Sequence, residues 1–117
     1  MEILEKNFEL SDIELKLKFE NLTLYPELFT HEAHLRLAWV FITKYGFDNA
    51  MTKIKIQLKS FATFIGAPEK YNEGLTDAAI RTVYEFIRCS ETDNFNDFIQ
   101  KNKILKNNFK EIIETRT

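Results

Sequence analysis

The residues best equipped for chemistry in this sequence are its only two histidines, His31 and His34. Residues three apart on a helix are neighbours, so the two imidazoles can converge on one ligand. Thr30 is a favourable helix N-cap, which would place both histidines in the first turn, where unpaired N–H groups and the helix dipole favour an anion. Both also flank an apolar stripe, and this position predicts that they lie at the floor of a pocket.

Three roles are open for the histidine pair. A transition metal usually takes three or four protein ligands, and the chain holds only these two histidines and one cysteine. No metal or cofactor is therefore assigned, although His31 and His34 are the candidate metal ligands. A third ligand would come from Glu73 rather than Glu32, which a helical wheel turns away from the stripe. Alternatively, each neutral imidazole could serve the structure by bonding a loop carbonyl.

Two boxes give this sequence a resemblance to a family of small uncharacterised bacterial proteins. The first is FTHEAHLRLAW at positions 29–39, and the second is KYNEGLT at positions 70–76. The family pattern is an aromatic-x-H-x-x-H-L box followed by a Y-H-x-T-[IL]-T box, and this chain resembles its Bacteroidetes branch over residues 22–90. The resemblance implies a candidate site at His31, His34, Tyr71 and Thr76. Asn72 replaces a family histidine and Gly74 a threonine, which argues against a three-histidine metal site.

The resulting hypothesis is a polar ligand pocket in which His31 and His34 face the loop that precedes a later helix. The candidate ligand-binding residues are His31, His34, Tyr71, Asn72, Glu73 and Thr76. A neutral imidazole could accept a proton while Tyr71 and Asn72 orient a ligand. No complete set of acid, base and nucleophile is visible, so the sequence assigns no reaction.

The alternative is a protein-interaction or regulatory module that binds no small ligand and has structural histidines. Its surface would include Leu37, Val40 and Phe64, which fall away from the main apolar stripes. The terminal helices could equally cover these residues. Cys89, opposite the stripe of its own helix and far from any histidine in sequence, is interpreted as incidental.

Helical signals recur along the chain. Ser11 and Glu14 form a capping box with a Leu10–Leu15 staple, although apolar residues alternate over 13–20 as in a strand. A lone strand could not satisfy its backbone, so a helix is favoured. Further helices are predicted at 31–45, at 48–65, after a cap at Thr76, after Asp93 or Asn94, and from about Lys103. The sequence predicts an all-α, compact bundle of five or six short helices in a single domain, 1–117.

Composition limits the function classes. A formal net charge of −2 argues against nucleic acid as a partner, and a basic patch of scattered lysines is not favoured. A single cysteine suits a reducing compartment. The N-terminal segment MEILEKNFEL is charged and lacks the apolar core of a signal peptide, and no apolar run approaches the roughly 20 residues of a membrane span. These features predict a cytoplasmic protein whose partner is a small molecule or another protein.

Overall fold

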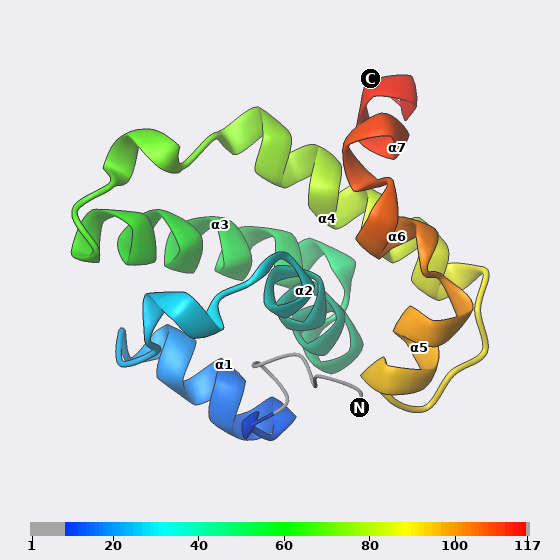
Figure 1. The fold of residues 1–117 in the computed structure, drawn as a ribbon, viewed down its shortest axis with the longest axis horizontal. Helices are drawn as coiled ribbons and strands as arrows, with labels where there is room; N and C mark the ends of the chain where they lie inside the picture. The colour runs from blue at the N-terminus through cyan, green and yellow to red at the C-terminus, as the bar shows by residue number, and fades with distance from the viewer. Residues whose placement is uncertain (1–8, 117) are drawn as a thin grey trace.

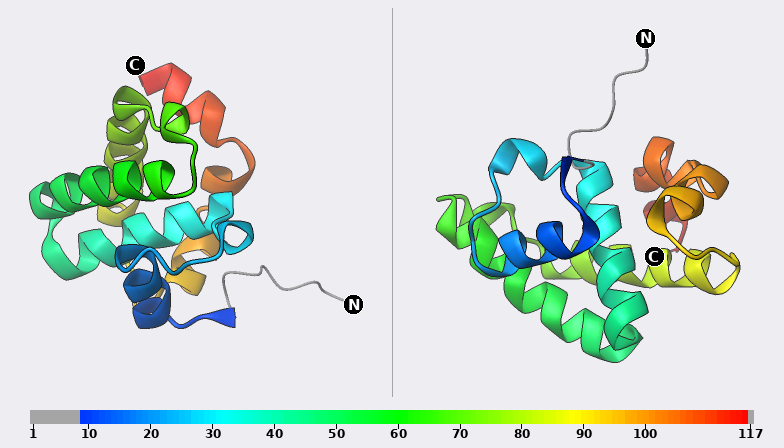
Figure 2. Two further views of the ribbon diagram at one scale, coloured as in Figure 1. Left: turned by 90° about the vertical axis from the view of Figure 1, so that its left-hand side faces the viewer. Right: turned by 90° about the horizontal axis from the view of Figure 1, so that it is seen from below.

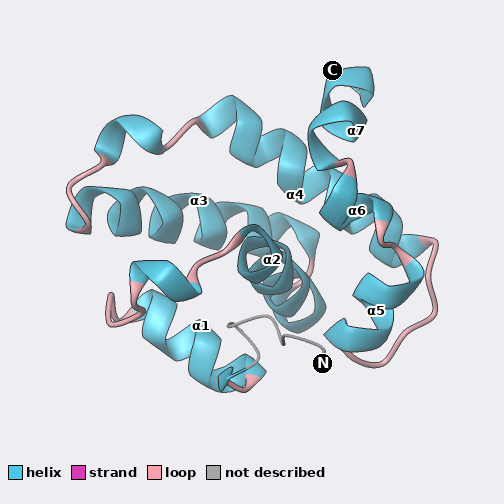
Figure 3. Ribbon diagram, in the orientation of Figure 1, coloured by secondary structure: helices cyan, strands magenta, loops and turns pink. Residues whose placement is uncertain are grey.

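The computed structural model describes residues 9–116, and every regular element within that range is a helix (Figure 3). This confirms the prediction of an all-α fold. Most of the segment used for the signal-peptide argument lies in residues 1–8, outside the described residues. None of the described helices is both long enough and apolar enough to cross a membrane.

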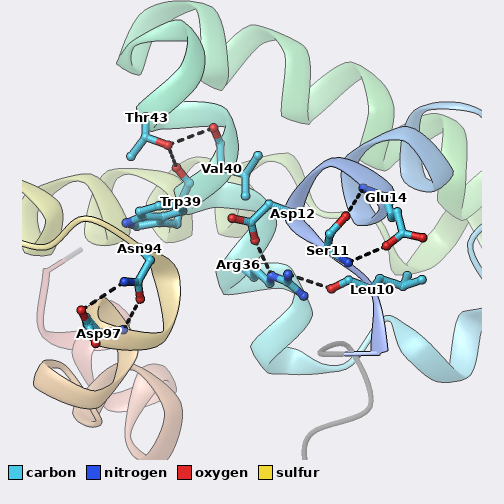
Figure 4. A network of polar contacts seen from close by, with 10 residues as sticks. All are labelled: Leu10, Ser11, Asp12, Glu14, Arg36, Trp39, Val40, Thr43, Asn94 and Asp97. Carbon is cyan, nitrogen blue, oxygen red and sulfur yellow. Dashed lines mark hydrogen bonds and ion pairs between the residues drawn. The ribbon is translucent and has the colours of Figure 1, made fainter.

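The first helix, α1 (Asp12–Glu20), begins at the predicted capping box. The Ser11 hydroxyl accepts the N–H of Glu14, and the Glu14 carboxylate accepts the N–H of Ser11 (Figure 4). Leu15 and Phe19, four residues apart, are buried, whereas Ile13 and Leu17 remain 70% and 48% exposed. Of the four apolar residues in the strand-like alternation, only Leu15 and Phe19 face the core. Their spacing of four residues is the burial pattern of a helix and not of a strand.

The central helix, α2 (His31–Tyr45), has the predicted ends. Thr30 caps its first turn, and Gly46 ends it with a φ of 83°, a backbone conformation that favours glycine. Seen from below, α2 lies between α1 on one side and α5 and α6 on the other (Figure 2). It also contacts α3 and α4, so helices cover several of its faces, while Thr43 and Lys44 near its end stay exposed.

This central position makes one part of the helical-wheel analysis wrong. Glu32, which the helical wheel turned away from the apolar stripe, is only 4% exposed, and Arg36 on the same helix is only 5% exposed. Leu37 and Val40 are buried as well, so of the proposed interaction surface only Phe64, which is 62% exposed, faces solvent. A helical wheel assigns one face of a helix to the core and the others to solvent. That assignment fails for α2 because neighbouring helices cover several of its faces.

Helix α3 (Phe47–Phe64) and helix α4 (Glu73–Arg88) form the upper part of the molecule in Figure 1. The 3₁₀ turn η3 (Pro68–Lys70) connects them, as η2 (Pro26–Leu28) connects α1 to α2. The predicted cap of α4 at Thr76 is wrong: Asn72 is the N-cap and its side-chain oxygen accepts the N–H of Leu75. Helix α4 therefore begins four residues earlier than expected, and the connecting loop is correspondingly shorter.

The chain ends in three short helices. Asn94 caps α5 (Phe95–Lys101), as predicted. The single last helix expected from Lys103 is instead two, α6 (Ile104–Asn107) and α7 (Phe109–Arg116). Asn108 interrupts them with a non-helical φ of −132°. Asparagine favours helix ends over helix interiors, and here it separates two axes so that α7 reaches α4.

Candidate functional site

Five of the six candidate ligand-binding residues line one cavity of about 1090 Å³. They are His31 and His34 from α2, Tyr71 and Asn72 from the loop before α4, and Thr76 from the first turn of α4. Glu73, the sixth candidate, is exposed and is not part of the lining. Because α4 begins at Glu73 rather than after Thr76, the helix carries Thr76 into the wall, where it is buried.

The wall of the cavity is built mainly from apolar side chains of α2, α3, α4 and α7. Figure 1 shows α4 passing above α2 and α3, with α6 and α7 at its right-hand end. The principal apolar lining residues are Phe29, Leu35, Ala38, Ile54, Leu58, Phe61, Ala62, Ile65, Leu75, Ala79, Ile80, Val83, Phe109 and Ile113. The polar residues predicted from the sequence are thus a minority of the lining.

His34 is held in place by its neighbours. Its Nδ1 donates to the Thr30 carbonyl at 2.7 Å, and its ring stacks on Phe29 with centroids 3.7 Å apart and planes 8° from parallel. Phe29 in turn contacts Phe19 and Phe61, so the stack is anchored in the core. Protein atoms crowd the imidazole, but water in the cavity still reaches part of its surface.

This environment changes the proton affinity of His34. Desolvation lowers its pKa, and nearby His31 acts in the same direction, while the bond to Thr30 opposes them. The net shift is downward, so the ring is neutral at pH 7. With Nδ1 donating to Thr30, the lone pair on Nε2 is the ring's acceptor.

His31 links α2 to the C-terminal helices. Its Nε2 lies 3.1 Å from the Leu105 carbonyl and must donate to it, and its ring lies against Phe109 with centroids 5.1 Å apart. Both histidines therefore bond a backbone carbonyl, which is the arrangement expected of structural histidines. The neutral His34 ring nevertheless keeps its Nε2 as a nitrogen that can accept a hydrogen bond.

The loop before α4 supplies further polar groups. The Asn72 side-chain oxygen is used in capping, which leaves its amide group as a donor, and the Thr76 hydroxyl donates to the Asn72 carbonyl at 2.8 Å. Burial, together with the nearby Glu73 carboxylate, raises the pKa of Tyr71. The Tyr71 hydroxyl is consequently protonated at neutral pH and can donate.

Three lysines of the lining were not among the predicted site residues: Lys70, Lys106 and Lys110. Lys106 also approaches the buried Glu32 carboxylate at 3.6 Å. Nothing in the local sequence around Lys106 and Lys110 indicates a site, because they reach the cavity only through the packing of α6 and α7. Lys70, by contrast, immediately precedes Tyr71 in the second box and could have been included on that ground.

Within residues 9–116, no three side chains of His, Cys, Asp or Glu gather closely enough to hold a metal ion. Cys89 is exposed at the end of α4. No protein-family model, curated protein or solved structure matches this chain. The resemblance of the two sequence boxes to a bacterial family therefore stays a prediction.

Proposed function

We propose that this chain is a small-molecule-binding domain whose ligand occupies the cavity between α2, α3, α4 and α7. The observation that carries the proposal is that two sequence segments about 40 residues apart supply His31, His34, Tyr71 and Asn72 to one cavity. Ligand sites are typically clefts of about 300–1000 Å³ with apolar walls and a few polar groups that fix orientation. The cavity agrees with this description in composition, and its volume of about 1090 Å³ lies just above this range.

The polar groups have complementary roles in binding. The neutral His34 ring presents an Nε2 that accepts a hydrogen bond, whereas Tyr71 and Asn72 present donors. A ligand with both a donor and an acceptor could be oriented between them while the apolar wall supplies most of the affinity. Binding is the function proposed, and no reaction is assigned.

A fluorescent probe tests this proposal directly. N-phenyl-1-naphthylamine is uncharged and brightens in an apolar pocket, so titration with the probe should give saturable binding. Ala79→Phe places a ring in the cavity and should weaken binding at least tenfold. Its neighbour Ala78, which is equally half-buried but outside the lining, provides the matched control Ala78→Phe.

The probe affinities of Ala79→Phe and Ala78→Phe can be compared once thermal unfolding shows that both variants are folded. Loss of binding in Ala79→Phe alone supports the cavity as the site. Equal binding by both variants, or no binding by the native protein, refutes the proposal.

A protein-interaction role is the second candidate, favoured by apolar residues on the outer face of α3. Ile56 and Phe64 are 60% and 62% exposed and, with Leu22, line a separate depression of about 560 Å³. An exposed apolar patch of this kind is a common feature of interaction surfaces. Sedimentation velocity over a wide concentration range, with Phe64→Ser as the variant, tests for self-association through this face.

A further inference from the structure

The charged residues of the cavity have a sign opposite to that of the whole chain. The chain has 18 acidic and 16 basic residues, whereas the lining contributed by residues 9–116 contains three lysines, Lys70, Lys106 and Lys110, and one acid, Glu114. All three lysines are exposed, so solvent and salt screen their field, but their charge still favours an anion over a cation at this cavity. The cavity is thus an attractive environment for an anion in a molecule that is otherwise slightly negative.

Two of these lysines lie at one end of the cavity, beside His31. The His31 bond to the Leu105 carbonyl fixes Lys106, the next residue, close to the first turn of α2. Lys110 follows Phe109, whose ring contacts His31. His31, Lys106 and Lys110 therefore form a basic cluster where α6 and α7 meet the N-terminal end of α2.

The rest of the cavity wall is apolar and suits an uncharged, hydrophobic part of a ligand. The apolar side chains of the lining that keep the most solvent-exposed surface are Ile65 at the end of α3 and Leu75 at the start of α4, which are 41% and 56% exposed. Such a surface gains free energy by covering an alkyl chain or an aromatic body, at about 25 cal/mol per Å² of apolar area removed from water. A basic cluster at one end of an apolar cavity is the complement of an amphiphile with a negatively charged head.

We propose that the ligand is a single-chain amphiphile with an anionic head, bound with its head at the His31–Lys106–Lys110 cluster and its apolar body along α3 and α4. This inference rests on the proposed function, since it identifies the class of ligand for the same cavity. The shared chemistry is that of a free long-chain carboxylate or of an anionic lipid, and the experiment distinguishes the two sources.

The test is displacement of N-phenyl-1-naphthylamine by three monomeric ligands of equal chain length: dodecanoate and dodecylamine below their micellar concentrations, and dodecan-1-ol below its solubility limit. Dodecanoate should displace the probe at a concentration at least tenfold lower than the other two. The preference should diminish between 20 mM and 500 mM salt, because salt screens the lysines. Equal displacement by dodecanoate and dodecan-1-ol refutes the proposal while leaving probe binding, and so the proposed function, intact.

Charge-reversal variants locate the head. Lys110→Glu should weaken dodecanoate at least tenfold and leave dodecan-1-ol unchanged, whereas Lys59→Glu, the same change outside this cavity, should alter neither. Lys110 is chosen over Lys106 because Lys106 neutralises the buried Glu32, and its loss could unfold the protein. Loss of dodecanoate binding in Lys70→Glu but not in Lys110→Glu overturns the assignment of the head.

Vesicles distinguish the source of the anion. Flotation with phosphatidylglycerol vesicles, compared with phosphatidylcholine vesicles, measures recognition of an anionic lipid surface. Displacement by monomeric dodecanoate without flotation supports a free carboxylate, and displacement together with flotation supports an anionic lipid of the same head chemistry. Flotation without displacement by any monomeric amphiphile overturns binding within the cavity.

Discussion

At the scale of single residues, His34 shows how an ordinary side chain acquires unusual properties from its contacts. The stack on Phe29 covers one face of the ring with protein atoms, and this partial desolvation disfavours its charged form. We expect the His34 pKa, measured from its Cε1–H resonance in an NMR titration, to lie below the ordinary value of about 6.5. Phe29→Leu should bring it upward by returning water to the ring.

The reference for that titration is the ordinary imidazole pKa of about 6.5. A His34 pKa at or above 6.5 would contradict the desolvation argument. A downward shift that survives Phe29→Leu would show that another contact is responsible.

The backbone freedom of Gly74 should have a measurable effect on the stability of the protein. Gly74 lies in the first turn of α4, and the nearest atom to an added Cβ is the Asn72 side-chain oxygen at 3.5 Å, an ordinary contact. Gly74→Ala should raise the free energy of unfolding by about 0.5–1 kcal/mol, since alanine has less backbone freedom to lose on folding.

The same substitution at Gly46 is the matched control for Gly74→Ala. Nothing lies within 4 Å of an added Cβ there, but φ is +83°, so Gly46→Ala should lower stability by about 1–3 kcal/mol. Urea unfolding measures both variants. If the free energy of unfolding changes in the same direction in both variants, the backbone φ at the glycine does not determine whether alanine stabilises or destabilises.

At the scale of elements, the attachment of α1 to α2 depends on Arg36. Its Nε donates to the Asp12 carboxylate and its Nη2 to the Leu10 carbonyl, both at 2.8 Å (Figure 4). The guanidinium side chain is 6% exposed, but the Asp12 side chain is 43% exposed, so solvent screens much of the attraction. Asp12→Ala should therefore lower the free energy of unfolding by only about 1 kcal/mol.

A double-mutant cycle with Arg36→Met separates the ion pair from the effect of Asp12 on the α1 dipole. The coupling energy from chemical denaturation should be positive and should decrease with added salt. A coupling energy of zero would mean that Asp12 acts through the helix end alone.

Local signals predicted helix ends well wherever one cap dominated the sequence. The Ser11–Glu14 box, Thr30 before α2 and Gly46 after it are all used as expected. The start of α4 was misplaced because Asn72 and Thr76 are both good caps and Gly74 between them weakens the helical pattern. Choosing between two such caps depends on tertiary packing, which buries Thr76 against the cavity.

At the scale of the whole molecule, burial depends on how many neighbours an element has, and this is not encoded in its own periodicity. Glu32 and Arg36 are buried because α1 and the C-terminal helices cover faces of α2 that the wheel left to solvent. The same limit applies to the candidate site. His31, His34, Tyr71 and Asn72 could be proposed from the two boxes, but the lysines of α6 and α7 reach the cavity only through the packing of these helices.

Among the described residues, five groups have pKa values that change on folding, and they predict how stability responds to pH. The Arg81 bond to Asp77 and the Ser11 backbone N–H bond to Glu14 lower the pKa values of these carboxyls, and burial lowers that of His34. In each case the unfolded chain binds protons more readily than the folded chain. Stability is therefore complete above the unfolded pKa and is lost as the pH falls.

On the alkaline side the sign is reversed. Burial raises the pKa of Tyr71, and although burial opposes it, the bonds to Glu20 and Tyr45 raise that of Lys16. Both groups keep their protons longer in the folded state, so stability is lost once the pH passes their unfolded values, about 10–10.4.

We therefore expect the free energy of unfolding, measured with urea at constant ionic strength, to be level between about pH 7 and pH 9.5 and to fall on either side. The first decrease, just below pH 6.5, belongs to His34, and the decrease at lower pH belongs to the carboxylates. In His34→Gln the first step should disappear while the lower one remains, because glutamine does not titrate. Stability that rises as the pH falls from 7 to 5 would contradict the signs of these shifts, and an unchanged first step in His34→Gln would place its origin elsewhere in the protein.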